Sequence, residues 1–379
     1  MIGQLFAGAG GWDEGLRAAG YDGPSIGVEF DETACRTALA AQHPRILADV
    51  ATFDPSMFVG IDGLIASPPC QSWSMAGDRK GELDRPEVYA RITSFARGRR
   101  PVEVEWHDER SPLTAEPMRY VVALMPRWIA LEQVPTVLPL WEHYAMLLRE
   151  LGYQVWTGVL SAERYGVPQT RKRAILIARR DGVPVGTPEP THRAYGDNHD
   201  HASLFGDPLP APVSMAEALG WGLPDRPAWT VTADGEETGG AEVFGNAKNR
   251  ERLRQIVMSN GPQNNATNRT ADEPAATIYC SRPGNLTWSL RNGNQANACE
   301  PAGTLFFGQR TNAVDWQDGG KSIRVSVEEA AVLQGFRPDY PWQGTKSAQY
   351  RQCGDAVPPP LATAILRPLI ETTADQAAA

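Results

Sequence analysis

The sequence predicts an α/β fold with two parts: a Rossmann-like domain with a mostly parallel sheet and helices on both faces, and a small β-rich domain. Two observations favour the first part. Short apolar segments alternate with helical patterns over about 180 residues, and a glycine-rich turn joins the first strand to the first helix. The second part is indicated between about residues 190 and 320, where short β segments are separated by Gly, Asn and Thr turns. A chain of 379 residues is long enough for two cores.

The first strand, Ile2 to Phe6, runs into the turn Ala7-Gly8-Ala9-Gly10-Gly11, and a helical pattern follows through Trp12 and Leu16. A strand, a glycine turn and a helix in this order are typical of a nucleotide-binding unit. The dinucleotide fingerprint requires a glycine three residues after Gly10, and Asp13 stands there instead. The turn therefore favours a nucleoside without a pyrophosphate.

Acidic residues follow the next two strands. Glu29 comes after Ser25 to Val28, about 20 positions past the glycine turn, where an acid accepts both ribose hydroxyls. Asp49 follows the apolar segment Ile46-Leu47-Ala48. The alternative is that Glu29 and Asp49 are ordinary helix caps or solvated loop acids.

Cys70 follows a fourth strand that ends at Ser67, and Pro68 and Pro69 stiffen the turn between them. In open α/β sheets the loops after the carboxyl ends of strands form the ligand crevice, so this position suits a nucleophile. The alternative for a lone cysteine is a small buried apolar residue.

The remaining elements complete the sheet. Further strands are predicted to end at Glu132, Leu160 and Ala178, with helices over 31–41, 116–125 and 137–151. A last helix over 362–370 follows Pro358-Pro359-Pro360, which can open a helix, and residues 372–379 are predicted to be disordered. The first domain is thus assigned to 1–187 and 340–379. The second takes 188–339, after a boundary where six prolines fall between Pro184 and Pro212.

Composition restricts the function classes. The five cysteines contain no Cys-x-x-Cys pair, which predicts a reduced intracellular protein without a structural zinc. No apolar run approaches the length of a membrane span and no leader opens the chain, so we expect a soluble, cytoplasmic protein without a membrane partner. The net charge is −9, but residues 245–325 hold ten Lys and Arg against six Asp and Glu, a local excess of four positive charges.

Further segments make the chain resemble the DNA (cytosine-5)-methyltransferase family of prokaryotes and phages. They match the family's motifs in order: Phe6 to Gly11, Glu29, Asp49, Pro69-Cys70-Gln71, Asp108 to Leu113, Glu132-Gln133-Val134, Gln169 to Arg173, Arg324 with Glu328 to Phe336, and Gly354 to Pro359. The resemblance implies a catalytic domain that binds S-adenosylmethionine, released as S-adenosylhomocysteine, and a target-recognition domain braced by residues 323–339. It places the cofactor against Phe6, Gly8, Gly10, Gly11, Glu29, Phe30, Asp49, Val50, Pro69, Leu113, Asp355 and Ala356, with no metal.

The resemblance also implies the catalytic roles. Cys70 adds as a thiolate to carbon 6 of cytosine, and Glu132 contacts ring nitrogen 3 and the exocyclic amine. Arg173 holds the base oxygen and favours the thiolate, while Arg171 orients Glu132 or a phosphate. Gln71, Ser74 and Gln169 are expected to contact the substrate.

The implied substrate is a specific sequence in double-stranded DNA, bound by a monomer in the cytoplasm of a prokaryotic cell or a phage-infected host. The target cytosine must leave the stacked duplex to meet the thiol. The loop after Cys70 would close over the DNA, with Gly77 and Gly81 as its hinge.

The chain departs from the family pattern at two positions where Asn is usual. Gln133 lengthens an amide arm, and Asp355 replaces an amide by a carboxylate beside the reacting methyl group. Three alternatives stay open: the same chemistry on RNA, a DNA alkyltransferase with an altered donor, and an inactive DNA-binding paralogue. The last would be expected to lose Cys70 or Glu132, and both are present.

Overall fold

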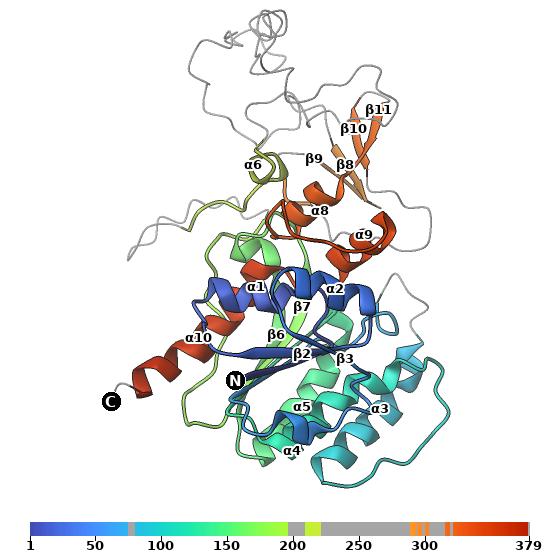
Figure 1. Cartoon of the computed structure of the whole chain (residues 1–379), viewed down its shortest axis with the longest axis vertical. Helices are drawn as coiled ribbons and strands as arrows, with labels where there is room; N and C mark the ends of the chain where they lie inside the picture. Colours follow the sequence, from blue (N-terminus) through green and yellow to red (C-terminus); the bar gives the residue numbers. More distant parts are fainter. Residues whose placement is uncertain are drawn as a thin grey trace, which may run out of the picture.

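The computed structural model describes residues 1–74, 80–195, 209–220, 289–292, 294–297, 300–302, 315–318 and 321–377. Its centre is a seven-stranded sheet in the order β3-β2-β1-β4-β5-β7-β6, which Figure 1 shows between two layers of helices. The strands are β1 (Ile2–Leu5), β2 (Ser25–Glu29), β3 (Arg45–Leu47), β4 (Gly63–Ala66), β5 (Trp128–Gln133), β6 (Gln154–Ser161) and β7 (Lys172–Arg179). Every strand predicted for this sheet is confirmed, with its end within one residue, whereas the strand-like segments 227–232 and 274–279 lie outside the described residues.

The topology fixes where a ligand crevice forms. Strands β1 to β5 run parallel, and β7 is inserted antiparallel between β5 and β6. Because β1 lies between β2 and β4, the chain leaves β1 in one direction and returns on its other side. The loops after β1 and β4 therefore diverge at this switch point, which is where open α/β sheets bind ligands.

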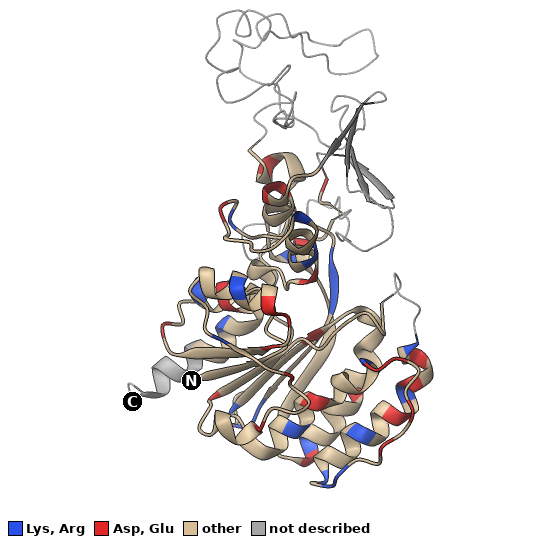
Figure 2. Cartoon of the chain, turned by 45° about the vertical axis from the view of Figure 1, so that its right-hand side comes forward, with Lys and Arg blue, Asp and Glu red and all other residues tan. Residues whose placement is uncertain are grey.

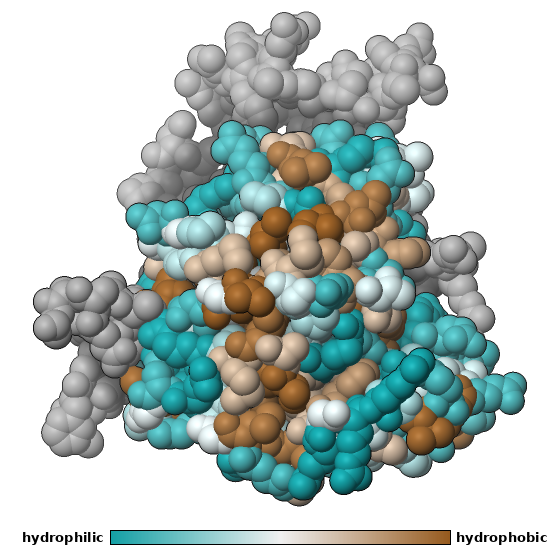
Figure 3. Space-filling model, turned by 60° about the horizontal axis from the view of Figure 1, so that its bottom comes forward, coloured by the Kyte–Doolittle hydropathy of each residue, from teal (hydrophilic) through white to brown (hydrophobic). Residues whose placement is uncertain are grey.

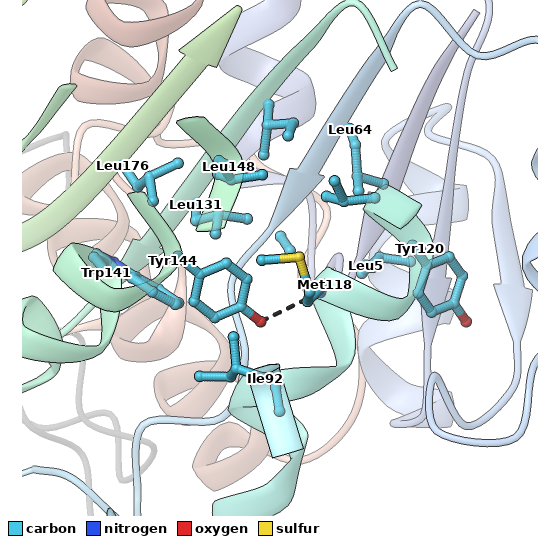
Figure 4. Packing of buried hydrophobic residues seen from close by; sticks show 14 of the residues in the cluster. Leu5, Leu64, Ile92, Met118, Tyr120, Leu131, Trp141, Tyr144, Leu148 and Leu176 are labelled. Atoms are coloured by element: carbon cyan, nitrogen blue, oxygen red, sulfur yellow. Dashed lines mark hydrogen bonds between the residues drawn. The ribbon is translucent and has the colours of Figure 1, made fainter. Parts of the chain in front are cut away.

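Both faces of the sheet are buried, so its strands are apolar throughout rather than alternating. On one face lie α3 (Gly81–Ala96), α4 (Glu116–Leu124) and α5 (Leu138–Glu150), packed on strand residues such as Leu5, Leu64 and Leu131. Figure 4 shows this core, where the Tyr144 hydroxyl accepts a hydrogen bond from the Met118 amide at 3.3 Å. On the other face α1 (Gly11–Ala18) and α10 (Pro359–Ala377) cover Ile2, Ile65 and Ile175.

The short elements stand between the strands. Helix α2 (Glu32–Ala40) connects β2 to β3. The 3-10 turns are η1 (Pro55–Phe58), η2 (Ser111–Ala115), η3 (Pro135–Val137) and η4 (Ala162–Tyr165). The predicted helices over 31–41, 116–125 and 137–151 are confirmed as α2, α4 and α5.

A third apolar cluster joins the later part of the chain to the glycine turn. It combines α6 (Met215–Ala218), Ala302, α8 (Val327–Leu333) and α9 (Lys346–Asp355) with Ala9. Beyond it lies a second, antiparallel sheet in the order β11-β10-β8-β9. Its strands are β8 (Ser289–Asn292), β9 (Asn294–Asn297), β10 (Asp315–Asp318) and β11 (Lys321–Arg324), which agrees with the short β segments expected there.

The predicted end of the last helix is wrong. Helix α10 does not stop near residue 370 but continues to Ala377, through residues expected to be disordered. Its first turns pack Leu361, Ile365 and Leu369 into the core, and extending an existing helix costs less than starting one because the first turn is already formed.

The surface mixes apolar and hydrophilic residues, as Figure 3 shows for the face below the sheet. Among the described residues, large apolar side chains such as Phe30, Met57 and Val102 are exposed. No helix in the described part of the chain is long and apolar enough to cross a bilayer.

Candidate active site

The glycine turn after β1 is shaped by left-handed backbone at Phe6, Gly8 and Gly10, whose φ angles are 54°, 56° and 117°. A β-carbon on Gly10 would lie 2.4 Å from the Tyr340 hydroxyl, which donates a hydrogen bond to the Ala9 carbonyl at 2.6 Å. Only glycine therefore fits at Gly10. A β-carbon on Gly8 would meet nothing within 4 Å, so this part of the turn faces open space.

Glu29 bridges the end of β2 to the glycine turn. Its two carboxylate oxygens accept hydrogen bonds from the amides of Gly8 at 2.8 Å and Asp31 at 2.7 Å. Each carboxylate oxygen has a second lone pair, which leaves capacity for the two hydroxyls of a ribose. The cap of α2 is Asp31, which accepts from Thr33 and Ala34, so Glu29 is not a helix cap.

Two further predicted residues lie at the same sheet edge. Asp49 is half-buried, and its Oδ1 accepts from the Ala51 amide at 2.9 Å, a local turn that fits the alternative of a loop acid as well. The Phe30 ring is 76% exposed, directly after Glu29. An exposed ring beside acids that can accept hydrogen bonds fits the base and sugar of a nucleoside.

Beneath the turn, Asp13 forms a buried ion pair with Arg45. Gln4 donates to the Asp13 carboxylate at 2.7 Å, and Arg45 also donates to the Gly8 carbonyl at 3.2 Å. Burial alone raises the pKa of Asp13, but Arg45, His43 and Gln4 together outweigh burial, and the net pKa of Asp13 is lowered. Asp13 is thus a charged support of the turn, and its negative charge in the first turn of α1 disfavours a phosphate there.

The Cys70 loop follows β4 and is held on both sides of the thiol. Its Pro68 carbonyl accepts from Gln133 Nε2 at 2.6 Å, and the Cys70 carbonyl accepts from the amides of Trp73 and Ser74. Trp73 is fully buried, and its indole donates to the Thr114 hydroxyl at 2.9 Å. The loop is therefore anchored before the nucleophile by β5 and after it by η2.

The predicted hinge at Gly81 is wrong, and Gly77 lies outside the described residues. Gly81 begins α3 and is buried, and a β-carbon there would lie 2.8 Å from the Ser72 carbonyl and 2.9 Å from the Trp73 ring. Its amide donates to the Ser72 carbonyl at 3.0 Å. Gly81 is needed for close packing rather than for motion.

Glu132 and Arg173 form an ion pair, with 2.8 Å between Oε1 and Nε. The pair joins the end of β5 to the start of β7, and both side chains are more than nine-tenths buried. Arg171, which is 1% exposed, donates to the Gly354 carbonyl at 2.9 Å. The direct partner of Glu132 is therefore Arg173 and not Arg171, while the other expectation, that Arg171 orients a phosphate, stays a prediction. Figure 2 shows the basic residues as a continuous blue segment where β7 begins.

The electrostatics of Cys70 also differ from the expectation. Burial raises the pKa of the Cys70 thiol, and the Asp355 carboxylate raises it further. Arg173 and Arg171 lower the thiol pKa, but they do not outweigh burial and Asp355, so the net pKa of the Cys70 thiol is raised. Burial likewise lowers the pKa of Arg171 to about 9, together with the neighbouring charge of Arg173.

Asp355 ends α9 beside this cluster. Asp355 is exposed, yet partial loss of hydration raises its pKa, against the opposing effect of Arg171, Arg351 and Arg173. The departure from the family pattern thus lies where its charge acts on the thiol.

Gln169 is not placed to contact a substrate. It is fully buried, and its side-chain amide donates to Gln334 Oε1 at 2.9 Å and to the Leu333 carbonyl at 3.2 Å. Gln334 in turn donates to the Ala356 carbonyl at 2.6 Å. The expected substrate contact is instead a brace between β7, α8 and the segment after α9. Gln334 lies in the segment that the family resemblance assigns to the brace, whereas sequence reasoning did not single out Tyr340 by itself, because no local pattern marks it as a site residue.

The other predicted residues are placed as follows. Gln71 is exposed and Ser74 is half-buried beside Cys70, while Pro69, Leu113 and Ala356 are half-buried. Val50 is 2% exposed, and its carbonyl accepts from the Tyr120 hydroxyl at 2.8 Å. A ligand at this edge could meet Val50 only through its backbone.

A model of the C-5 cytosine-specific DNA methylase family matches residues 1–102 and 103–371, nearly the whole chain. The chain belongs to this family and is a DNA (cytosine-5)-methyltransferase. It is similar to the Type II methyltransferases M1.HphI of Haemophilus parahaemolyticus, 26% identical over 98% of this chain and 87% of the relative, and M.DdeI of Desulfomicrobium norvegicum, 24% identical over 96% and 86%.

Solved structures agree on the fold. A putative DNA modification methyltransferase from an Escherichia coli prophage matches with a TM-score of 0.56 and 19% identity over 98% of this chain and 99% of its own. The Dnmt2 methyltransferase of S. pombe matches with a TM-score of 0.57 and 15% identity over 98% of each chain. At these identities the two solved structures support a shared fold alone.

The family implies S-adenosylmethionine as cofactor, and the glycine-turn site fits its nucleoside part. The free lone pairs of Glu29 and the open space at Gly8 match a ribose, and the buried Asp13 disfavours a phosphate, which this cofactor lacks. Among the described residues, no three His, Cys, Asp or Glu side chains are grouped as metal ligands.

Proposed function

We propose that this methyltransferase acts on carbon 5 of a cytosine that it flips out of a specific double-stranded DNA sequence, through a covalent Cys70 adduct. The observation that carries the proposal is the grouping of Cys70 with the Glu132–Arg173 ion pair and Arg171 at the carboxyl ends of β4 and β5. The nucleoside site lies at the adjacent strand ends, so the thiol and the methyl donor can meet one base.

When bound, S-adenosylmethionine supplies an electrophilic methyl group. We assign its ribose to Glu29, its adenine to Asp49 and the exposed face of Phe30, and its other contacts to the glycine turn at Phe6, Gly8, Gly10 and Gly11. Further contacts come from the half-buried Pro69, Leu113 and Ala356, from Asp355 and from the Val50 backbone.

The chain's own residues prepare the base. Carbon 5 of cytosine is a weak nucleophile, and addition of Cys70 Sγ at carbon 6 turns the ring into an enamine that attacks through carbon 5. Glu132, fixed by Arg173, stabilises charge at ring nitrogen 3 and the exocyclic amine. An Arg173 N–H group that does not contact Glu132 is assigned to the base oxygen. Loss of the carbon 5 proton then expels Cys70.

Residues 188–339 are proposed as the target-recognition domain, with 323–339 as its brace. The contacts Gln169–Gln334 and Gln334–Ala356 support the brace, because they join α8 to both sides of the catalytic cluster. The excess positive charge of residues 245–325 suits the DNA phosphates, although the chain as a whole is acidic. We propose that the enzyme acts as a monomer in the cytoplasm of a prokaryote or a phage-infected host.

The deciding experiment incubates wild type and Cys70→Ser with labelled S-adenosylmethionine and unmethylated genomic DNA or RNA, followed by digestion and mass analysis. We expect 5-methylcytosine in duplex DNA from the wild type only, because a serine hydroxyl is far less nucleophilic than a thiolate. DNA containing 5-fluorocytosine should form a covalent complex at Cys70. Methylation by Cys70→Ser, or modified RNA in place of DNA, would contradict the proposal.

A further inference from the structure

We propose that Arg119 is a positioning residue of the cofactor site: from α4 it fixes the loop after β3, residues 49–53, in the shape that meets the adenine. We name this segment the adenine loop. The inference rests on the proposed function, which assigns the adenine to Asp49 and a further cofactor contact to the Val50 backbone. It deepens that function by naming a residue of α4 that lies outside the segments assigned to the site.

The sheet fixes only the start of the adenine loop. Strand β3 lies at the edge of the sheet and pairs with β2 alone. This pairing ends where the Ala48 amide donates to the Glu29 carbonyl at 3.0 Å. Beyond that point the Asp49 carbonyl accepts from the amides of Thr52 and Phe53, which closes a tight turn. The orientation of the far side of this turn must therefore be set by another element.

Helix α4 supplies the donors for the far side of the turn. Arg119 Nη2 donates to the carbonyls of Val50 and Ala51, the latter at 3.1 Å. Its Nη1 donates to the Phe53 carbonyl at 3.1 Å. The Tyr120 hydroxyl donates to the carbonyls of Val50 at 2.8 Å and Phe53 at 3.2 Å. One planar guanidinium thus binds the carbonyls of three loop residues at once, which the single point charge of a lysine would not do.

The Arg119 guanidinium is itself held from behind. Its Nε forms an ion pair with Glu116 Oε2 at 2.8 Å, and the Glu116 side chain is 2% exposed. Its Cζ lies 4.7 Å from the centre of the Tyr120 ring, which is fully buried. Because a charge-assisted pair and a ring fix the plane of the guanidinium, they also fix the directions in which it donates.

The ion pair alone does not explain the position of Arg119. The other oxygen of Glu116 already pairs with Arg91 of α3 at 3.2 Å, so that carboxylate has a second cation. The remaining donors of Arg119 go to the loop segment that carries Asp49 and Val50. Groups that bind a ligand must be held to within about 0.5 Å, and residues that support them provide this precision.

The test measures S-adenosylmethionine affinity by calorimetry in the full-length wild type, in Arg119→Met and in Arg91→Met. Each substitution takes one guanidinium from the buried Glu116, but in the described part of the chain Arg91 has no hydrogen bond to the adenine loop. We expect Arg119→Met to weaken binding about tenfold and Arg91→Met less than about twofold. Single-turnover methylation at saturating S-adenosylmethionine should change less than about threefold in both, because the loop acts on binding rather than on chemistry.

A double-mutant cycle shows whether Arg119 acts through the adenine loop. Asp49→Ala combined with Arg119→Met should bind S-adenosylmethionine within about twofold of Arg119→Met alone, because the loop contact is already lost. Glu29→Ala combined with Arg119→Met should instead multiply the two losses, since Glu29 is assigned to the ribose and belongs to β2. Losses that multiply with Asp49→Ala as well would overturn the inference.

Tyr120→Phe keeps the buried ring and removes one donor to the loop, so it supplies a measurement even if Arg119→Met does not fold. It should weaken S-adenosylmethionine binding about threefold. Wild-type affinity in Tyr120→Phe or in folded Arg119→Met, or equal losses in Arg119→Met and Arg91→Met, would overturn the inference. Cys70→Ser is run in parallel and should bind the cofactor like wild type. Methylation by that variant would overturn the proposed function instead.

Discussion

The two halves of the site are built differently. At β1 to β3 the functional groups are held by the backbone: Glu29 accepts from two amides, and the glycine turn is fixed by Tyr340. At β4, β5 and β7 the functional groups hold one another, through the buried pair Glu132–Arg173 and the charges around Cys70. The cofactor half is therefore held by hydrogen bonds to the main chain, whereas the catalytic half depends on mutual neutralisation of its own charges.

The largest expected effect comes from breaking that neutralisation. In Arg173→Ala, Glu132 is left as an unpaired buried charge, so we expect a loss of about 3 to 5 kcal/mol in the free energy of unfolding. Single-turnover methylation should fall by about 100-fold or more, because the charge that stabilises the base is misplaced. Urea unfolding and labelled methyl transfer measure the two quantities.

Two matched variants sharpen the comparison. Arg97→Ala breaks an ion pair with Glu150 in which both side chains are about half exposed, and it should lower the free energy of unfolding by at most about 1 kcal/mol.

Glu29→Ala should weaken S-adenosylmethionine binding by about 1 to 3 kcal/mol in calorimetry, while methylation at saturating cofactor changes little. If Arg173→Ala and Glu29→Ala both alter cofactor binding and transfer to the same extent, the two halves are not distinct.

The second-largest expected effect concerns the buried Asp13–Arg45 ion pair, which supports the glycine turn in the cofactor half. Asp13→Asn leaves Arg45 as an unpaired buried charge and should destabilise the protein by about 3 kcal/mol near neutral pH. The folded pKa of Asp13 lies below its unfolded value, so its contribution is complete above the unfolded pKa of about 3.9 and is lost as pH falls through the folded pKa.

Urea unfolding from pH 7 to pH 3 measures this contribution. The gap between wild type and Asp13→Asn should stay constant down to about pH 4 and narrow below it. Asp339→Asn, with the same charge change at the surface, should show no such gap. A gap that widens on acidification would contradict the assigned sign of the shift.

The difference between the halves also explains what the sequence could predict. Strand ends, the glycine turn, Glu29 and Cys70 carry local signals, because each lies at or just after the end of an apolar segment, and the structure confirms the strand ends. Roles that depend on long-range contacts were assigned wrongly. The choice between Arg171 and Arg173 as the partner of Glu132 depends on the register of β5 with β7, and the buried Gln169 donates to the carbonyl of Leu333 in α8, 164 residues later.

Gly81 illustrates the same limit. A glycine in a polar segment has the sequence signature of a hinge, and only the position of the Trp73 ring shows that it is a packing residue. The domain boundaries at 188 and 339 remain predictions. Met215 and Ala302 pack in one apolar cluster with α8. This packing does not mark where one domain ends and the next begins.

The smallest expected effect concerns Gln133, which ties the start of the Cys70 loop to the end of β5. Its Nε2 donates to the Pro68 carbonyl and its Oε1 accepts from the Val134 amide, both at 2.6 Å, and the side chain is 2% exposed. Gln133→Asn restores the usual family residue but shortens the arm by one methylene, so it cannot make both bonds on this backbone. We expect a loss of roughly 1 kcal/mol in the free energy of unfolding.

Because Pro68 lies two residues before the nucleophile, the same change should slow covalent trapping on 5-fluorocytosine DNA by less than about tenfold, a consequence of slightly looser placement of the thiol. Gln133→Met, which keeps the length and lacks both hydrogen-bonding groups, is the matched control and should be slower still. If Gln133→Met traps DNA at the wild-type rate, the amide does not position the Cys70 loop, and the rigidity of Pro68 and Pro69 alone accounts for it.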